Sequence, residues 1–234
     1  MDTITLWFTL GTGGMALGTL LLAAGLRYVP RADWRRYAIL IAVPGIAVVA
    51  YALMALDIGA VDTATGSVAY VPRYVDWLLT TPLHIIYLGI FAGAARGVIA
   101  RATALQAATI VFGLVGAIVA SPLKWLLYLA GLGAFAGVVY YTYVDYDEAA
   151  QAQGGSTAAL YSKLRAFLVV LWLVYPLIWI TGPNAVGLMD VETTALVVAY
   201  IDIVSKVGLG LIALNGHLAL SGTDFETTDT SPSD

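Results

Sequence analysis

Five ionisable side chains interrupt two stretches of sequence that are otherwise apolar. Arg73, Asp76 and His84 lie in the first stretch, and Asp202 and Lys206 lie in the second. A charge at the centre of a bilayer costs at least about 2.5–3.5 kcal/mol on insertion scales, so ionisable groups in a membrane span are candidates for function. A desolvated amine can form a Schiff base with an aldehyde. The lysine is therefore the first candidate for covalent chemistry.

The carboxyl groups are spaced so that they can accompany that amine. Asp202 precedes Lys206 by four residues, which puts both on one face of a helix. Arg73 and Asp76 are three residues apart and also share a face. A protonated Schiff base in a dry site needs nearby anions, which the two carboxylates would supply. The alternative is an ion-pair cluster that only holds helices together, although small residues and hydroxyl groups provide membrane packing at lower cost.

A stripe of aromatic residues has helical spacing. Trp172, Tyr175, Pro176 and Trp179 follow the pattern i, i+3, i+4, i+7, and Trp77 adds an indole beside the first carboxylate. The proline favours a kink. Such a stripe serves either as plain helix packing or as a clamp for a long, flat, apolar ligand, and the residues alone leave both interpretations open.

The composition places these residues in a membrane protein. The chain has 234 residues, of which 60% are hydrophobic and 11% charged, whereas about 25% charged residues is usual in soluble domains. This excludes a soluble enzyme, a disordered chain and a nucleic-acid binder. Cysteine is absent, which excludes disulfides and zinc–thiolate sites. We expect no metal site and no enzymatic activity.

The apolar windows predict an all-α bundle of seven transmembrane helices. A span needs ~20 mostly apolar residues, and none of the windows shows the alternation of a β-barrel strand. The expected spans are residues 3–26, 35–57, 72–95, 102–120, 123–145, 158–181 and 191–218. The connection from Asp57 to Val71 predicts a short β-hairpin. Residues 1–220 form the membrane domain, and residues 221–234 are expected to be a disordered, acidic, cytoplasmic tail.

The basic residues predict the orientation of the bundle. One set of connections carries or flanks eight basic residues, whereas the other set has only Lys124. By the positive-inside rule the N-terminus lies outside and the C-terminus lies inside. The eight residues are Arg27, Arg31, Arg35, Arg36, Arg96, Arg101, Lys163 and Arg165.

Three motifs together resemble a known family. Residues 73–82, RYVDWLLTTP, resemble the third-helix signature of microbial (type 1) rhodopsins. The aromatic stripe resembles their sixth helix, and Asp202 with Lys206 resembles their seventh. The resemblance covers all seven spans. It is nearest to the haloarchaeal sensory rhodopsins, with bacteriorhodopsin as a near relative, which implies an archaeal cell membrane as the location.

The resemblance implies a cofactor and a role for each of several residues. All-trans retinal would be bound covalently to Lys206 as a Schiff base. Asp76 would be primary counterion and proton acceptor, Asp202 second counterion, and Arg73 part of the counterion complex. Tyr51 matches a tyrosine that hydrogen-bonds within this cluster. The residues implied to line the retinal site are Trp77, Thr80, Thr81, Gly113, Tyr128, Phe135, Trp172, Tyr175 and Trp179.

One position separates the two functions that the family offers, a light-driven outward proton pump and a sensor. In the pumps a carboxylate eleven residues after the acceptor, ~16 Å along the helix, returns a proton to the Schiff base. Here that position is Tyr87. A phenol with a pKa near 10 is a poor donor. Asn184 and Thr194 likewise replace the pumps' external release pair. A slow photocycle is expected, which suits a phototaxis sensor; a slow outward pump is the alternative.

Three further residues refine this interpretation. Ser205 matches a hydroxyl residue of second-type sensory rhodopsins, where pumps have alanine. Tyr200 points away from the site, toward either lipid or a transmembrane transducer that reads the signal. His84 faces the site and departs from the family pattern. It is either a neutral histidine bonded to a carbonyl group or water, or a group that tunes colour, isomer preference or reprotonation.

Other classes fit less well. The motifs do not resemble G-protein-coupled receptors. A secondary transporter would show paired half-repeats and broken helices, which are not found in the sequence. A chloride pump would replace the carboxylate of Asp76 by a neutral hydroxyl residue. The expected partners are therefore the lipid bilayer and a transducer, and a homo-oligomer is left open.

Overall fold

The computed structural model describes the backbone of residues 2–228 and the side chains of residues 2–218. Within this part of the chain, seven helical segments are long and apolar enough to cross a membrane, as predicted. Short 3₁₀ turns at Leu26–Tyr28 and Arg31–Asp33 join the first two. The α-helices are α1 (Thr3–Gly25), α2 (Trp34–Ala55), α3 (Val71–Ala92), α4 (Arg96–Ile118), α5 (Leu123–Tyr143), α6 (Asp145–Ala152), α7 (Gly155–Trp172), α8 (Val174–Thr181) and α9 (Val191–Thr228).

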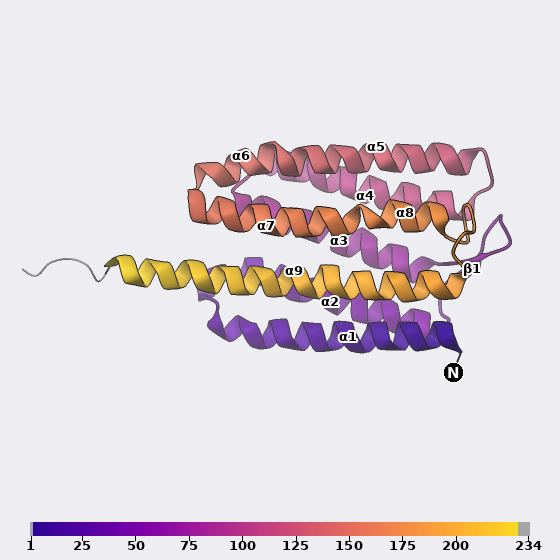
Figure 1. Ribbon diagram of the computed structural model, residues 1–234, viewed down its shortest axis with the longest axis horizontal. Helices are drawn as coiled ribbons and strands as arrows, with labels where there is room; N and C mark the ends of the chain where they lie inside the picture. The colour runs from indigo at the N-terminus through magenta and orange to yellow at the C-terminus, as the bar shows by residue number, and fades with distance from the viewer. Residues whose placement is uncertain (1, 229–234) are drawn as a thin grey trace, which may run out of the picture.

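The helices lie side by side along one long axis (Figure 1). Helices α5 and α6 share one span, and α7 and α8 share another. Consecutive helices from α1 to α5 pack as neighbours, and α9 closes the bundle against α1, α2 and α7. The N-terminus and the hairpin lie at one end, called the outer end here after the predicted orientation, and α9 extends past the other helices at the opposite, inner end.

The predicted hairpin is confirmed. Strand β1 (Ala60–Asp62) pairs antiparallel with β2 (Val68–Tyr70), and Asp62 lies opposite Val68. Gly66 has a φ of +75°, a left-handed conformation that glycine adopts without steric cost. The hairpin holds the chain where it enters α3, the helix that carries Asp76.

Two carboxylates outside the spans cap helices at the outer end. The backbone N–H of Thr5 donates to Asp2 and that of Thr193 donates to Asp190, each over 2.6 Å. These donors favour the charged carboxylates and lower the pKa of both. Each charged carboxylate therefore contributes to the stability of the fold. This contribution is fully present at pH values above the ordinary carboxyl pKa, and it is lost as the pH falls through the lowered pKa.

The sixth span is broken beside the aromatic stripe. Helix α7 ends at Trp172 and α8 begins at Val174, so the break falls at Leu173. Pro176 lacks a backbone N–H and cannot bond the carbonyl group four residues earlier, which belongs to Trp172. The regular helix is thus interrupted a few residues before the proline, and the kink itself stays a prediction.

The predicted tail, residues 221–234, is only partly described. Helix α9 continues to Thr228, and residues 229–234 lie outside the described part of the chain. The boundary of the membrane domain at residue 220 stays a prediction.

Close packing of α1 against α9 leads to a prediction on stability. A Cβ atom on Gly18 would lie 2.2 Å from a methyl carbon of Val207, whereas one on Gly13 would meet no atom within 4 Å. We expect Gly18→Ala to lower the free energy of unfolding by ~1–3 kcal/mol, because the added methyl group overpacks the contact. The matched variant Gly13→Ala should be neutral or slightly stabilising. Unfolding of both variants in detergent checks this, and equal stability would contradict it.

Candidate functional site

Lys206 lies in the interior with both predicted carboxylates. Its side chain is 1% exposed, and its amine donates to Asp76 and also to Asp202 at 3.4 Å. Helix α9 supplies Asp202 one turn from the lysine, and α3 supplies Asp76 from across the bundle. One cation with two anions thus forms the centre of the site, as the spacing of the residues predicts.

The two carboxylates have different surroundings. The hydroxyl of Tyr51 donates to Asp202 at 2.8 Å, the indole N–H of Trp77 donates at 3.1 Å, and the hydroxyl of Tyr175 donates as well. One carboxylate oxygen of Asp76 accepts a hydrogen bond from the Lys206 amine. The other oxygen has no hydrogen-bond partner among the residues described. Three donors hold the negative charge on Asp202. Asp76 is therefore the carboxylate better placed to accept a proton.

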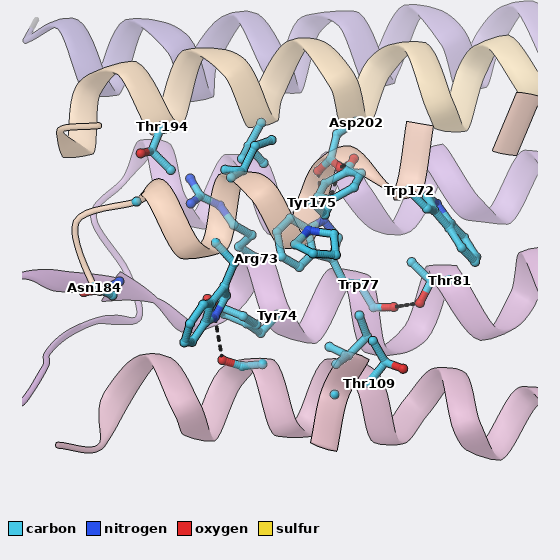
Figure 2. Close-up of a pocket in the computed structure, with 18 of the residues that line it drawn as sticks. Arg73, Tyr74, Trp77, Thr81, Thr109, Trp172, Tyr175, Asn184, Thr194 and Asp202 are labelled. Carbon is cyan, nitrogen blue, oxygen red and sulfur yellow. Dashed lines mark hydrogen bonds between the residues drawn. The ribbon is translucent and has the colours of Figure 1, made fainter. Parts of the chain in front are cut away.

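An internal cavity extends from this centre between α3, α4, α5, α7, α8 and α9. Several aromatic rings line it: Trp77 packs edge-on against Tyr175, with ring centroids 5.1 Å apart, and Trp179 stacks on Tyr128 at 4.8 Å. In Figure 2 the Trp77 and Tyr175 rings lie together near Asp202. The predicted residues on the cavity wall are Arg73, Trp77, Thr81, His84, Gly113, Tyr128, Phe135, Trp172, Tyr175, Trp179, Asp202, Ser205 and Lys206.

The two threonines of α3 differ in position. The hydroxyl of Thr81 lines the cavity, donates to the Trp77 carbonyl group at 2.8 Å and accepts a hydrogen bond from the Gln106 amide at 2.9 Å. Thr80 is buried outside the cavity wall, and its hydroxyl donates to the backbone carbonyl group of Asp76 at 2.8 Å. Thr80 thus supports the backbone that carries the carboxylate.

Arg73 lies toward the outer end of the cavity, with Asn184 and Thr194 (Figure 2). Its guanidinium group packs over the rings of Phe8 and Tyr70, 5.7 and 5.8 Å from their centroids. It forms no salt bridge with any carboxylate in the described part of the chain. The predicted counterion complex therefore has its arginine apart from the central ion pairs.

Ser205 and Tyr200 lie on different sides of α9. The hydroxyl of Ser205 lines the cavity and donates to the backbone carbonyl group of Asp202 at 3.1 Å. The side chain of Tyr200 is 68% exposed on the outside of the bundle. This placement agrees with the predicted direction and leaves Tyr200 available to lipid or to a partner.

The sequence reasoning missed several lining residues and one hydrogen bond. Thr109 precedes Gly113 by one turn, and Gly131 precedes Phe135 by one turn, so helical spacing could have found both. The bond from Trp77 to Asp202 joins residues far apart in the chain and left no signal in the sequence. The further lining residues include Tyr74, Thr109, Ile110, Leu127, Gly131, Leu132, Ile178 and Val198.

Comparison with known proteins supports what this geometry indicates. The bacteriorhodopsin-like protein family matches residues 2–220. Sensory rhodopsin-2 of Haloarcula vallismortis is 50% identical over 230 residues, which cover 98% of this chain and 97% of that protein. Sensory rhodopsin-2 of Natronomonas pharaonis is 38% identical over 227 residues, with 97% and 95% covered. The crystal structure of thermophilic rhodopsin from Rubrobacter xylanophilus has a TM-score of 0.89 at 30% identity, with 93% and 97% covered.

The fold and the site define a seven-helix membrane protein with a buried lysine beside an aromatic cavity. The chain belongs to the bacteriorhodopsin-like family, which confirms the resemblance seen in its motifs. It is accordingly a multi-pass protein of the cell membrane.

Proposed function

We propose that this protein is a retinal-binding photoreceptor that signals light to a membrane transducer in phototaxis. The observation that carries the proposal is the Lys206 amine, buried between Asp76 and Asp202 on the wall of an aromatic cavity. The names of the two sensory rhodopsin-2 relatives support the same function.

The residues present fit retinal. A polyene aldehyde needs an amine to condense with and a dry, flat-walled slot, and the cavity combines Lys206 with the rings of Trp77, Trp172 and Tyr175. Lys206 would hold the all-trans form covalently as a Schiff base. When bound, retinal supplies a light-driven isomerisation about a double bond.

The protein's own groups then hold and move a proton. In the dark Lys206 keeps the proton, because two carboxylates stabilise its positive charge. After light absorption the proton moves from the Lys206 nitrogen to Asp76, which has an oxygen without a partner within the described residues. Asp202 keeps its charge because three donors surround it. The ion pair between α3 and α9 is thereby lost.

Loss of that ion pair would release the packing of the helices around it. The break at Leu173 lies beside the cavity, between Trp172 and Tyr175. Helix α7 can therefore shift relative to α8 without breaking a regular helix. A local change of charge that biases two helix arrangements is a common switching device. A transducer packed against the sixth and seventh spans, with Tyr200 as a contact, would read the shift.

A slow outward proton pump is the second candidate. The proton acceptor Asp76 is present, and the cavity continues outward to Arg73 and Thr194. However, the inner half of α3 carries the buried phenol of Tyr87 where a pump needs a carboxylic acid. This favours the sensor, and a sensor without its transducer is still expected to move some protons.

Flash photolysis distinguishes these functions. With retinal added, the purified protein is expected to show a visible band that bleaches after a flash and returns more slowly than a few milliseconds. Illuminated cells that express the protein alone should acidify their medium weakly. Recovery within a few milliseconds without azide, together with strong acidification, would favour the pump. The absence of any visible band would contradict retinal binding altogether.

A further inference from the structure

His84 is a buried imidazole on the wall of the site. Its side chain is 1% exposed and lines the same cavity as Lys206. Its ring lies 6.0 Å from that of Trp172, centroid to centroid. Neither ring nitrogen has a hydrogen-bond partner within residues 2–218. A buried polar group left unsatisfied costs ~1–3 kcal/mol, so an imidazole without a protein partner favours a water molecule or a ligand in the cavity.

The position of His84 along α3 is specific. It follows Asp76 by eight residues, which places it ~12 Å further toward the inner end and about 80° around the helix. The Lys206 amine contacts Asp76 and therefore lies at the level of that carboxylate. His84 is thus on the inner side of the amine, whereas Asp76 and Asp202 accept hydrogen bonds from the amine directly.

Among the described residues that line the cavity, the only carboxyl group is that of Asp202, at the level of the amine. From His84 to the end of α3 the sequence holds only the phenol of Tyr87 as another titratable group. The walls contributed by α4, α5 and α7 include the uncharged side chains of Gln106, Phe135 and Trp172. The titratable groups around the imidazole are Asp76 and Tyr87 on α3, Tyr175 on α8, and Asp202 and Lys206 on α9.

The charge of the site controls when His84 can take up a proton. While Lys206 is protonated, its positive charge opposes a second cation in the same cavity. Transfer of that proton to Asp76 removes the positive charge of Lys206 and the negative charge of Asp76 together, so the net charge of the site stays the same and Asp202 remains negative. The repulsion between Lys206 and an imidazolium is absent in that state. The imidazole is therefore easier to charge while the Lys206 nitrogen lacks a proton.

We propose that His84 relays protons from the inner half of the bundle to the Lys206 nitrogen. This deepens the proposed function and rests on it. A water molecule from the inner side, itself resupplied by the medium, gives a proton to one ring nitrogen, which forms the imidazolium. The proton on the other ring nitrogen passes through water in the cavity to the Lys206 nitrogen. His84 returns to the neutral form with its two nitrogens exchanged in role, and no other bond changes.

Kinetics after a flash provide the first test. The variants His84→Leu and His84→Gln are reconstituted with retinal, pigment yield is measured first, and rates are compared per pigment formed. Return of the visible band should slow about 100-fold in both, the low end of what a positioned acid–base group contributes. Tyr87→Phe is the matched control, because it removes the other inner titratable group from α3, and it should change the rate little. Slowing in Tyr87→Phe alone, or an unchanged rate in His84→Leu, overturns the relay.

Isotope labelling provides a second test that does not depend on rates. The chain has two histidines, so ¹⁵N-histidine in the His217→Asn variant labels His84 alone. Light-minus-dark infrared spectra should show imidazolium bands that shift with ¹⁵N. If that variant does not fold, subtracting the labelled His84→Leu spectrum from that of the unsubstituted protein isolates the same bands. A pigment that forms normally but shows no light-dependent imidazole band refutes the relay, whereas failure to form pigment refutes the proposed function instead.

Discussion

Substitution of Lys206 by alanine is expected to abolish the visible band that forms when retinal is added. Without the amine no Schiff base can form, and retinal in the cavity would keep the spectrum of a free aldehyde. The loss should be complete, since no other amine contacts the Asp76 and Asp202 pair among the described side chains. Absorption spectra of the purified variant check this, and borohydride reduction followed by peptide mass spectrometry should find retinal on Lys206.

Two controls separate the linkage from the fold. Removing the cation leaves two buried carboxylates without their partner, which costs ~3–5 kcal/mol and can itself prevent folding. Lys206→Arg keeps a cation there but cannot form the imine, so it should fold and remain colourless. Lys124→Ala removes the other deeply buried lysine, whose amine donates to the Asn184 carbonyl group, and should keep its colour. Colour in Lys206→Arg would disprove the covalent attachment.

Replacement of Asp76 by asparagine is the second change with a large expected effect. The variant should still bind retinal, because Lys206 retains Asp202 as an anionic partner. Its visible band should move to longer wavelength. With one carboxylate removed, the positive charge on the protonated Lys206 nitrogen is held less tightly in the ground state, so the excitation energy falls. Proton transfer from Lys206 should fall by at least about 100-fold, as is typical when a positioned acid–base group is removed. Flash photolysis measures both quantities.

Asp202→Asn is the contrasting variant. It deprives the donors from Tyr51, Trp77 and Tyr175 of a charged acceptor, each such bond contributing ~1.5–3 kcal/mol. We expect a reduced yield of folded pigment from Asp202→Asn and a nearly normal yield from Asp76→Asn. The opposite order of yields would show that the two carboxylates have been assigned the wrong roles.

The sequence was sufficient for the spans and for the centre of the site. Continuous apolar windows define membrane helices because the bilayer leaves few alternatives for a polar backbone. The cost of intramembrane charges then singled out Asp76, Asp202 and Lys206, and the structure places all three in contact. Here one physical principle, the cost of burying a charge, carries the prediction.

Other details depend on tertiary contacts that have no signature in the sequence. From the sequence, Lys124 is expected to be a basic residue of a connection between spans. In the structure α5 begins one residue before it, and its buried amine donates to the Asn184 carbonyl group. Thr80 belongs to a motif implied to face retinal, but its hydroxyl turns to the backbone of Asp76. The bond from Trp77 to Asp202 depends on how α3 and α9 are placed across the bundle.

The interruption at Leu173 divides the sixth span into arms of unequal length. Helix α7 has 18 residues and α8 has 8, which correspond to ~27 Å and ~12 Å. If the short arm stays anchored at the hairpin end of the bundle, the long arm acts as a lever with its fulcrum beside the cavity that Lys206 lines. A tilt of about 5° at the fulcrum would displace the far tip by roughly 2 Å over that length. A small tilt beside Lys206 would thus become a larger displacement at the inner end of the bundle, where a neighbouring protein could sense it.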